Sequence, residues 1–221
     1  MDMQMVNRVP DWVTPIAWIF LVLAVVSAVV ITVDVARGRR HGSVAADLVW
    51  VAAALYLGPA AVVLHRRHVA RTADATRDSE PSPAEVGLPG GGASAVAHLV
   101  GVPLVIASGL TIAGIDLWVM IIVIGVLAVA LLLGYELLAG RAHGAGRRPP
   151  LARAAGAAVL TVLAFDVGMG GWMVVLHYNE LMPPATEGSF WFLMQLGILL
   201  GLLTGYPAAR WLVERGRSVP A

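Results

Sequence analysis

The sequence predicts an all-α fold, a polytopic membrane bundle of six transmembrane helices with a long polar linker between the second helix and the third. Two observations predict it. Of the 221 residues, 58% are hydrophobic and 13% are charged, whereas a soluble domain carries roughly 25% charged residues. The apolar residues are also gathered into runs, and a spanning helix needs about 20 mainly apolar residues in succession.

Six runs are long enough to span a membrane. They cover residues 12–36, 43–64, 94–113, 117–139, 153–178 and 189–213. The first run is longer than the core of a signal peptide, which has about 7–15 residues, and no small-x-small cleavage site follows it. We therefore expect this run to stay in the protein as a span. Residues 114–116 form a tight turn, which makes a hairpin of the third and fourth helices.

The segment between the second and third runs differs from the other connections. Residues 66–93 are polar, contain three prolines and include Gly90-Gly91-Gly92, a composition typical of a flexible surface linker. The predicted organisation is an N-terminal two-helix membrane unit (1–65), this linker (66–93), a four-helix membrane domain (94–213) and a short C-terminal tail (214–221).

The arginines indicate the orientation, because cytoplasmic loops of membrane proteins carry an excess of positive residues. With six spans and the N-terminus inside, twelve of the 15 basic residues fall on the inner side, while Arg37, Arg39 and Arg40 fall outside. The sequence therefore predicts a multi-pass protein of a bacterial plasma membrane with both termini in the cytoplasm.

Composition also excludes several classes of function. A net charge of +1 without a clustered basic face argues against a nucleic-acid partner, which leaves the lipid bilayer as the predicted partner. The chain has no cysteine, which excludes disulfides, thiolate metal ligands and a thiol nucleophile. No Ser/His/Asp order or HExxH-like pair is present, so an enzyme is the weakest reading.

Three glycines of the last run predict close helix packing. Gly197, Gly201 and Gly205 recur every four residues, a small-xxx-small pattern that lets two helices approach closely. The helix that they contact is a neighbour in the same chain, a second copy of the chain or another membrane protein.

Ionisable side chains inside the predicted spans are candidate functional groups, because inserting each costs roughly 2.5–3.5 kcal/mol. Asp166 lies near the middle of the fifth helix, so it must find a partner, water or a proton. Asp34, His98 and Glu136 are secondary candidates, because a structural hydrogen bond near a helix end explains them as well. We expect His98 and Glu136 to lie near the inner surface, where they could pair.

The fifth helix carries a polar stripe. At about 100° per residue, Met169, Met173 and His177 fall on the same narrow face as Asp166. Two polar residues of the sixth helix share a face that we expect to lie across the bundle from this stripe. The candidate intramembrane site comprises Asp166, Met169, Met173, His177, Gln195 and Tyr206.

These residue types suit two kinds of ligand. Thioethers with an imidazole suit a soft cation, copper(I) above all, whereas a carboxylate placed between His177 outside and His98 with Glu136 inside suits a proton path. Methionine also fills gaps in ordinary cores, so a non-catalytic structural or accessory subunit is the alternative. Haem is disfavoured, because the predicted spans place His98 and His177 on the order of 20 Å apart in depth.

Segments of the last third resemble a known family. Residues 165–173 read Phe-Asp-Val-Gly-Met-Gly-Gly-Trp-Met, and residues 190–197 read Phe-Trp-Phe-Leu-Met-Gln-Leu-Gly. Together with Tyr206-Pro207 they resemble a bacterial membrane family catalogued as domain of unknown function 4396. The resemblance implies a multi-pass membrane protein and no established activity. Members carry cysteine after the histidine that matches His98, whereas this chain has Leu99. If the family site uses that thiolate, this chain has either lost the site or binds through methionine instead.

Overall fold

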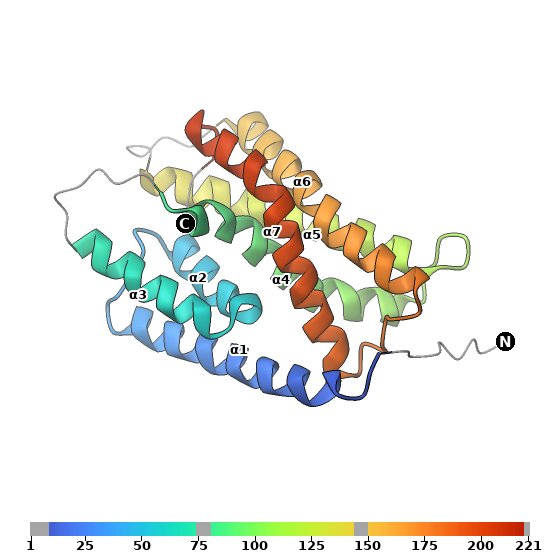
Figure 1. The fold of residues 1–221 in the computed structure, drawn as a ribbon. Coiled ribbons are helices and arrows are strands. Elements are labelled where there is room, and N and C mark those ends of the chain that lie inside the picture. The colour runs from blue at the N-terminus through green and yellow to red at the C-terminus, as the bar shows by residue number, and fades with distance from the viewer. Residues whose placement is uncertain (1–8, 74–80, 144–149, 219–221) are drawn as a thin grey trace.

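Helices make up most of the described chain. The computed structural model describes residues 9–73, 81–143 and 150–218. Within these ranges there are seven helices: α1 Val13–Ala36, α2 Val44–Leu57, α3 Pro59–Ala73, α4 Pro83–Ser108, α5 Asp116–His143, α6 Leu151–Tyr178 and α7 Gly188–Glu214 (Figure 1). Five of them, α1 and α4 to α7, are long and apolar enough to cross a membrane. The predicted all-helical membrane bundle is confirmed, with five candidate spans in place of six.

The second predicted span is wrong because the helix breaks at Gly58. Helix α2 ends after 14 residues, and Gly58 then takes a φ of 56° and a ψ of −134°, a conformation that glycine adopts without the strain of a side chain. Pro59 follows, and the residue before a proline is disfavoured from the helical region. The run 43–64 therefore forms α2 and the start of α3, two antiparallel helices joined by a sharp turn.

The predicted linker 66–93 is also corrected, since most of it is helical. Residues 66–73 belong to α3 and residues 83–93 to α4. Helix α4 begins with a capping box: Ser82 Oγ accepts a hydrogen bond from the Glu85 N–H (3.4 Å), and the Glu85 carboxylate accepts one from the Ser82 N–H (3.0 Å). The non-helical remainder is residues 74–82, of which 74–80 lie outside the described residues.

The glycines at 90–92 lie inside α4 and allow close helix packing. A Cβ on Gly91 would lie 2.5 Å from Tyr56 Oη of α2, and a Cβ on Gly90 would lie 3.3 Å from Thr161 Cγ2 of α6. Because these glycines have no side chain, α2 and α6 can pack directly against α4. Glycines that predict a flexible loop by composition thus serve as a contact surface between helices.

Helices α6 and α7 form the closest pair in the bundle. A Cβ on Gly201 would lie 2.6 Å from the ring of Phe165, and one on Gly205 would lie 3.4 Å from the Phe165 Cα. From the other side, a Cβ on Gly168 would lie 2.6 Å from the carbonyl carbon of Leu200. The glycine face of α7 therefore packs on a neighbouring helix of the same chain, and association of two chains through it stays a prediction.

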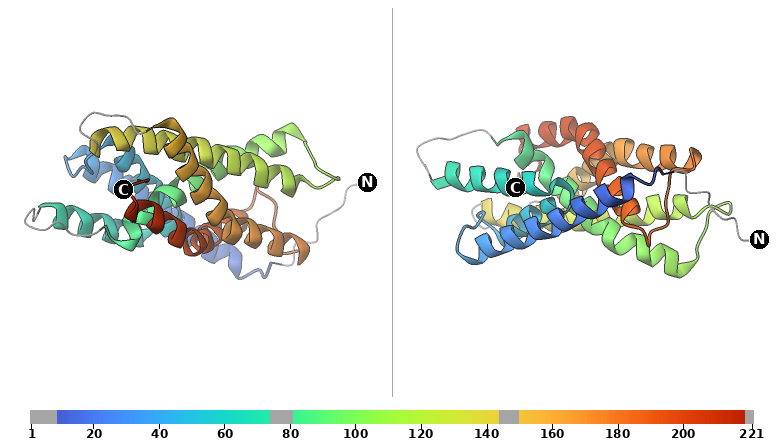
Figure 2. Two further views of the ribbon diagram at one scale, coloured as in Figure 1. Left: turned by 90° about the horizontal axis from the view of Figure 1, so that it is seen from above. Right: turned by 60° about the horizontal axis from the view of Figure 1, so that its bottom comes forward.

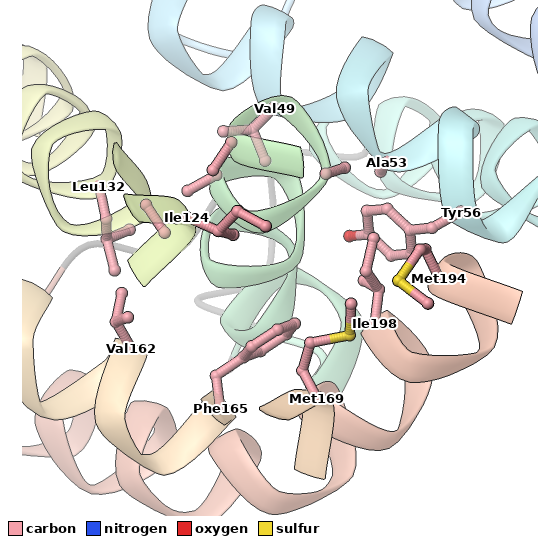
Figure 3. Close-up of a cluster of buried hydrophobic side chains, with 14 of the residues drawn as sticks. Val49, Ala53, Tyr56, Ile124, Leu132, Val162, Phe165, Met169, Met194 and Ile198 are labelled. Carbon is pink, nitrogen blue, oxygen red and sulfur yellow. The ribbon is translucent and has the colours of Figure 1, made fainter. Parts of the chain in front are cut away.

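The core lies where five helices meet. Figure 3 shows side chains from α2, α5, α6 and α7 arranged around α4, with Tyr56 and Met194 side by side and Met169 directed toward them. Tyr56, Met169 and Met194 are at most 1% exposed. This packing fixes the register of α7 against α2 and α4, which positions the candidate site described below.

The described arginine side chains all lie at one end of the bundle, which we call the arginine end. They are Arg37, Arg39, Arg40, Arg66, Arg67, Arg71, Arg153, Arg210, Arg215 and Arg217. The C-terminal ends of α1, α3, α5 and α7 meet there with the N-terminal ends of α2, α4 and α6 (Figures 1 and 2). Helix α1 begins at the opposite end of the bundle, and α7 ends at the arginine end.

The α2–α3 hairpin enters and leaves the bundle at the arginine end. Arg66 of α3 reaches back to Asp34 at the end of α1, with 3.5 Å between Arg66 Nε and Asp34 Oδ2. The buried turn at Gly58 packs on Phe20, which lies roughly 10 Å from the start of α1 at 1.5 Å per residue. The hairpin is therefore re-entrant: its tip stops inside the bundle, where protein surrounds the non-helical backbone.

Candidate functional site

The polar stripe predicted on the fifth spanning helix, now α6, lies in two different surroundings. Met169 and Met173 are buried in the core, at 1% and 2% exposure. The Met169 sulfur lies against Gly197 of α7, where a flexible thioether fills the space left by the glycine. Both methionines thus occupy positions of ordinary core residues.

The remaining members of the predicted site lie apart from one another. Asp166 is half-buried and directed at α5, with its Oδ2 3.3 Å from where a Cβ on Gly125 would lie. His177 lies near the other end of α6, edge-on to Tyr178 with 5.4 Å between ring centroids. Tyr206 lies beside Arg210 on α7, toward the arginine end. Asp166 and Tyr206 lie at similar depth, because Gly205 packs on Phe165, whereas His177 lies about three turns farther along α6. Among the described residues, no hydrogen bond or ion pair joins these three side chains.

Two of the secondary candidates have structural partners at the arginine end. The Asp34 carboxylate accepts hydrogen bonds from Arg39 Nη1 (3.0 Å) and Arg66 Nε (3.5 Å). Glu136 accepts a hydrogen bond from the Ser218 hydroxyl. The predicted pairing of Glu136 with His98 does not occur, because α4 begins at Pro83 and places His98 in its second half rather than at its inner end.

His98 and Gln195, by contrast, are brought together. Both line a cavity of about 140 Å³ between α1, α2, α4 and α7, well above the roughly 10–15 Å³ that one water needs. The other lining residues are mostly apolar, Leu55, Ala95 and Ile198 among them. Two candidates from helices far apart in the sequence therefore line one cavity, which opens to the surface of the bundle beside Val25 and Leu99, 57% and 49% exposed.

The hydrogen bonding of His98 fixes which of its ring nitrogens is free. Nδ1 lies 2.8 Å from the Ser94 carbonyl oxygen, and a carbonyl oxygen can only accept, so Nδ1 carries the proton. In the neutral ring Nε2 is then an unprotonated nitrogen with a free electron pair. His98 is 3% exposed, and Nε2 is buried without a hydrogen-bond partner.

Gln195 supplies a second atom of the same kind. Its Oε1 is also buried without a hydrogen-bond partner, and an amide oxygen offers electron pairs only. A buried acceptor without a partner costs about 1–3 kcal/mol, and two residues that line this cavity each contain one. What would satisfy both atoms is a cation or a donor of hydrogen bonds.

The cavity offers soft ligands and no negative charge. Met194 lines it together with His98 and Gln195, and none of the described lining residues is Asp or Glu. Among the described residues, no group of three or more His, Asp or Glu side chains is arranged to hold a metal ion. An imidazole, a thioether and an amide oxygen are nevertheless a donor set that a soft cation accepts.

The position of His98 also changes the argument about haem. His98 was expected near the inner surface, whereas it lies 15 residues along a 26-residue helix. His177 is not among the residues that line the cavity. Helices α4 and α6 both begin at the arginine end, and His177 lies 26 residues along α6, so the two histidines still differ in depth by roughly 16 Å at 1.5 Å per residue.

A second polar group, which we call the histidine cluster, was not predicted from the sequence. It consists of His41, His65, His68, Asp47 and Glu85. His65 and His68 are three residues apart, a spacing that places both imidazoles on one helical face. That signal was present in the sequence, but the polar composition around it predicted a linker beginning at residue 66. The cluster instead joins α3 to α2, α4 and the loop after α1.

Comparison with known proteins places the chain in a family. No curated protein and no solved structure matches it. The family described as domain of unknown function (DUF4396) matches residues 84–218, a range that covers α4 to α7 and contains His98, Met194 and Gln195. The match confirms the resemblance carried by residues 165–173 and 190–197, and the chain belongs to the family of domain of unknown function 4396.

Proposed function

We propose that this integral membrane protein binds a small soft cation, copper(I) first, in the cavity at His98. The observation that carries the proposal is that His98 and Gln195 line one cavity, and that His98 Nε2 and Gln195 Oε1 are both buried without a hydrogen-bond partner. A histidine that binds a metal usually donates its other ring N–H to a carbonyl or carboxylate. Because His98 donates its Nδ1–H to the Ser94 carbonyl, Nε2 is the nitrogen that would bind the cation.

The surroundings favour a soft ion of low charge. The Met194 thioether and the His98 imidazole are ligands that suit copper(I). Moving an ion out of water costs more as its charge rises, and a paired negative charge normally offsets that cost. Since the described lining residues include no carboxylate, a monovalent cation fits the cavity better than a divalent one.

The orientation that we propose follows from the arginine end. Five crossings with a re-entrant α2–α3 hairpin place Arg37, Arg39 and Arg40 on the same side as the other described arginines. Under the positive-inside rule this end faces the cytoplasm of the plasma membrane. The C-terminus then lies inside and the N-terminus outside, unlike the arrangement predicted from six crossings.

Copper(I) binding to the purified protein tests the proposal. The protein in detergent is titrated under reducing conditions against a chromophoric copper(I) chelator, and retained copper is measured by elemental analysis. The chain has no cysteine, so thiols contribute no background. We expect wild type to retain about one copper per chain, and His98→Ala and Gln195→Leu to bind at least about tenfold more weakly, a loss of 1.4 kcal/mol or more.

Two control variants separate this cavity from other candidates. Asp166→Asn tests the stripe on α6, and His65→Gln tests the histidine cluster, so both should retain wild-type binding. If wild type takes up no copper, or if His98→Ala binds it unchanged, the proposal is wrong. A water-filled cavity in a structural or accessory subunit is then the better account, since Asp34 and Glu136 already have structural partners.

A further inference from the structure

The histidine cluster contains a chain of hydrogen bonds that runs through two buried imidazoles. His41 Nδ1 lies 2.9 Å from Asp47 Oδ1, and His41 Nε2 lies 3.0 Å from His65 Nδ1. His65 Nε2 lies 3.8 Å from Asp34 Oδ2. His41 is 5% exposed and His65 is fully buried. The chain therefore links Asp47 of α2, the loop after α1, α3 and the end of α1.

The chemistry of these atoms gives the chain a direction. An ionised carboxylate can only accept, so His41 carries its proton on Nδ1 and its Nε2 accepts from His65 Nδ1. His65 Nε2 is then left with a free electron pair, buried and without a hydrogen-bond partner. It faces Asp34 Oδ2, which also bears electron pairs. This arrangement lacks one proton, and His65 Nε2 is where that proton would bind.

Charged groups surround the chain on every side. Asp34 of α1 is paired with Arg39 of the following loop and with Arg66 of α3. On the other side, His68 of α3 and Glu85 of α4 are 2.8 Å apart.

Two more charged groups complete this environment. Arg71 of α3 is paired with Glu85. Asp47 of α2 receives hydrogen bonds from the backbone N–H and the ring of His41, and no described arginine is paired with it. An imidazolium at His41 would therefore meet a carboxylate whose charge is not already offset.

We propose that His41 and His65 form a proton-binding site that controls how firmly the re-entrant α2–α3 hairpin is held at the arginine end. A proton that binds to His65 Nε2 makes that ring an imidazolium. Its Nδ1 proton can then transfer along the hydrogen bond to His41 Nε2, across 3.0 Å between the two nitrogens, which leaves His65 neutral and places the charge on His41 beside Asp47. No atom beyond that single proton is gained or lost.

The same site loosens the hairpin in acid. Burial, together with neighbouring His41, lowers the pKa of His65 from 6.5 to about 4, and burial also lowers the pKa of His41. When the hairpin opens, both rings reach water and their pKa values return toward about 6.5. The closed hairpin thus binds fewer protons than the open one. Its stability is fully present above pH 6.5 and is lost as the pH falls toward 4.

Opening the hairpin would also uncover the cavity at His98, because Leu55 of α2 forms part of the cavity wall. This consequence rests on the proposed function. The proton site itself does not, and the experiments that test it use no copper.

Two measurements on the full chain test the proton site. In protein labelled with ¹⁵N-histidine, we expect at pH 7.5 that His41 and His65 are neutral with the proton on Nδ1, and that they bind protons only well below pH 6.5. In hydrogen exchange corrected for intrinsic rates, amides of residues 44–73 should exchange at least tenfold faster relative to α6 at pH 4.5 than at pH 7.5.

Matched variants decide the outcome. His41→Gln/His65→Gln keeps polar side chains that take up no proton near neutral pH, and it should abolish the pH dependence of exchange in the hairpin. His177→Gln, at the opposite end of the bundle, should preserve that dependence. If the double variant does not fold, the ¹⁵N measurement on wild type still decides. The proposal is overturned if the two rings carry protons on Nε2 at pH 7.5, or if acid leaves hairpin exchange unchanged.

Discussion

The free nitrogen of His98 shows how one hydrogen bond determines the chemistry of a residue. The Ser94 carbonyl holds the proton on Nδ1 and leaves Nε2 unprotonated, which is the nitrogen that the proposed cation would bind. The sequence identifies His98 and Gln195 as candidates because both are polar within apolar runs. It could not bring them together, because their meeting depends on α4 starting at Pro83 and on the register of α7 against it.

The methionines illustrate the opposite case. Met169 and Met173 fall on one face with Asp166, which suggests a ligand set, but both are buried in the core. Helical periodicity places side chains on a common face and does not tell whether a helix or a cavity lies opposite. Met194 was missed for the same reason, since nothing in its own run distinguishes it from a core residue.

Truncating Met169 should therefore affect stability and not copper binding. Met169→Ala leaves a cavity beside Gly197 and should lower the free energy of unfolding by about 2–5 kcal/mol. Val167→Ala, on the same helix but 71% exposed, is the control and should change stability little. Thermal unfolding in detergent measures both, and copper retention by a folded Met169→Ala protein should equal that of wild type. Loss of copper with unchanged stability would return the site to the stripe on α6.

Whole elements were predicted well where an apolar run was unbroken and poorly where it was interrupted. The predicted run 153–178 corresponds to α6 Leu151–Tyr178, and 189–213 to α7 Gly188–Glu214. The hairpin was missed because Gly58-Pro59 interrupts a run whose average hydrophobicity stays high. The start of α4 was missed because its glycines, which pack against α2 and α6, have the composition of a loop.

Gly168 provides the sharpest test of packing between elements. A Cβ at this position would overlap the backbone of Leu200, whereas a Cβ at Gly171 of the same helix would meet nothing within 4 Å. Gly168→Ala should force α6 and α7 apart and lower stability by about 1–3 kcal/mol. Gly171→Ala should be neutral or stabilise by up to about 1 kcal/mol through helix propensity. Equal unfolding temperatures for the two variants would contradict this packing of α6 on α7.

At the scale of the whole molecule, the re-entrant hairpin is the central feature. It forms part of the wall of the cavity at His98, it carries Asp47, His65 and His68 of the histidine cluster, and it lowers the number of candidate spans from six to five. The predicted orientation counts the run 43–64 as a span and so separates Arg37, Arg39 and Arg40 from the other arginines, whereas the orientation that we propose places them together. Charge and hydropathy together indicate a membrane bundle. The turn at Gly58-Pro59 depends on the local backbone conformation, which the average hydropathy of the run 43–64 does not detect.

Single cysteines in intact cells test the hairpin most directly, because the natural chain has no cysteine. Leu110→Cys lies between α4 and α5, and Arg40→Cys lies between α1 and α2. With a re-entrant hairpin, a membrane-impermeant maleimide should label Leu110→Cys from outside and label Arg40→Cys only after the membrane is opened. The reverse pattern would keep the hairpin but invert the proposed orientation. Labelling of both positions from outside intact cells would contradict the hairpin and restore six crossings.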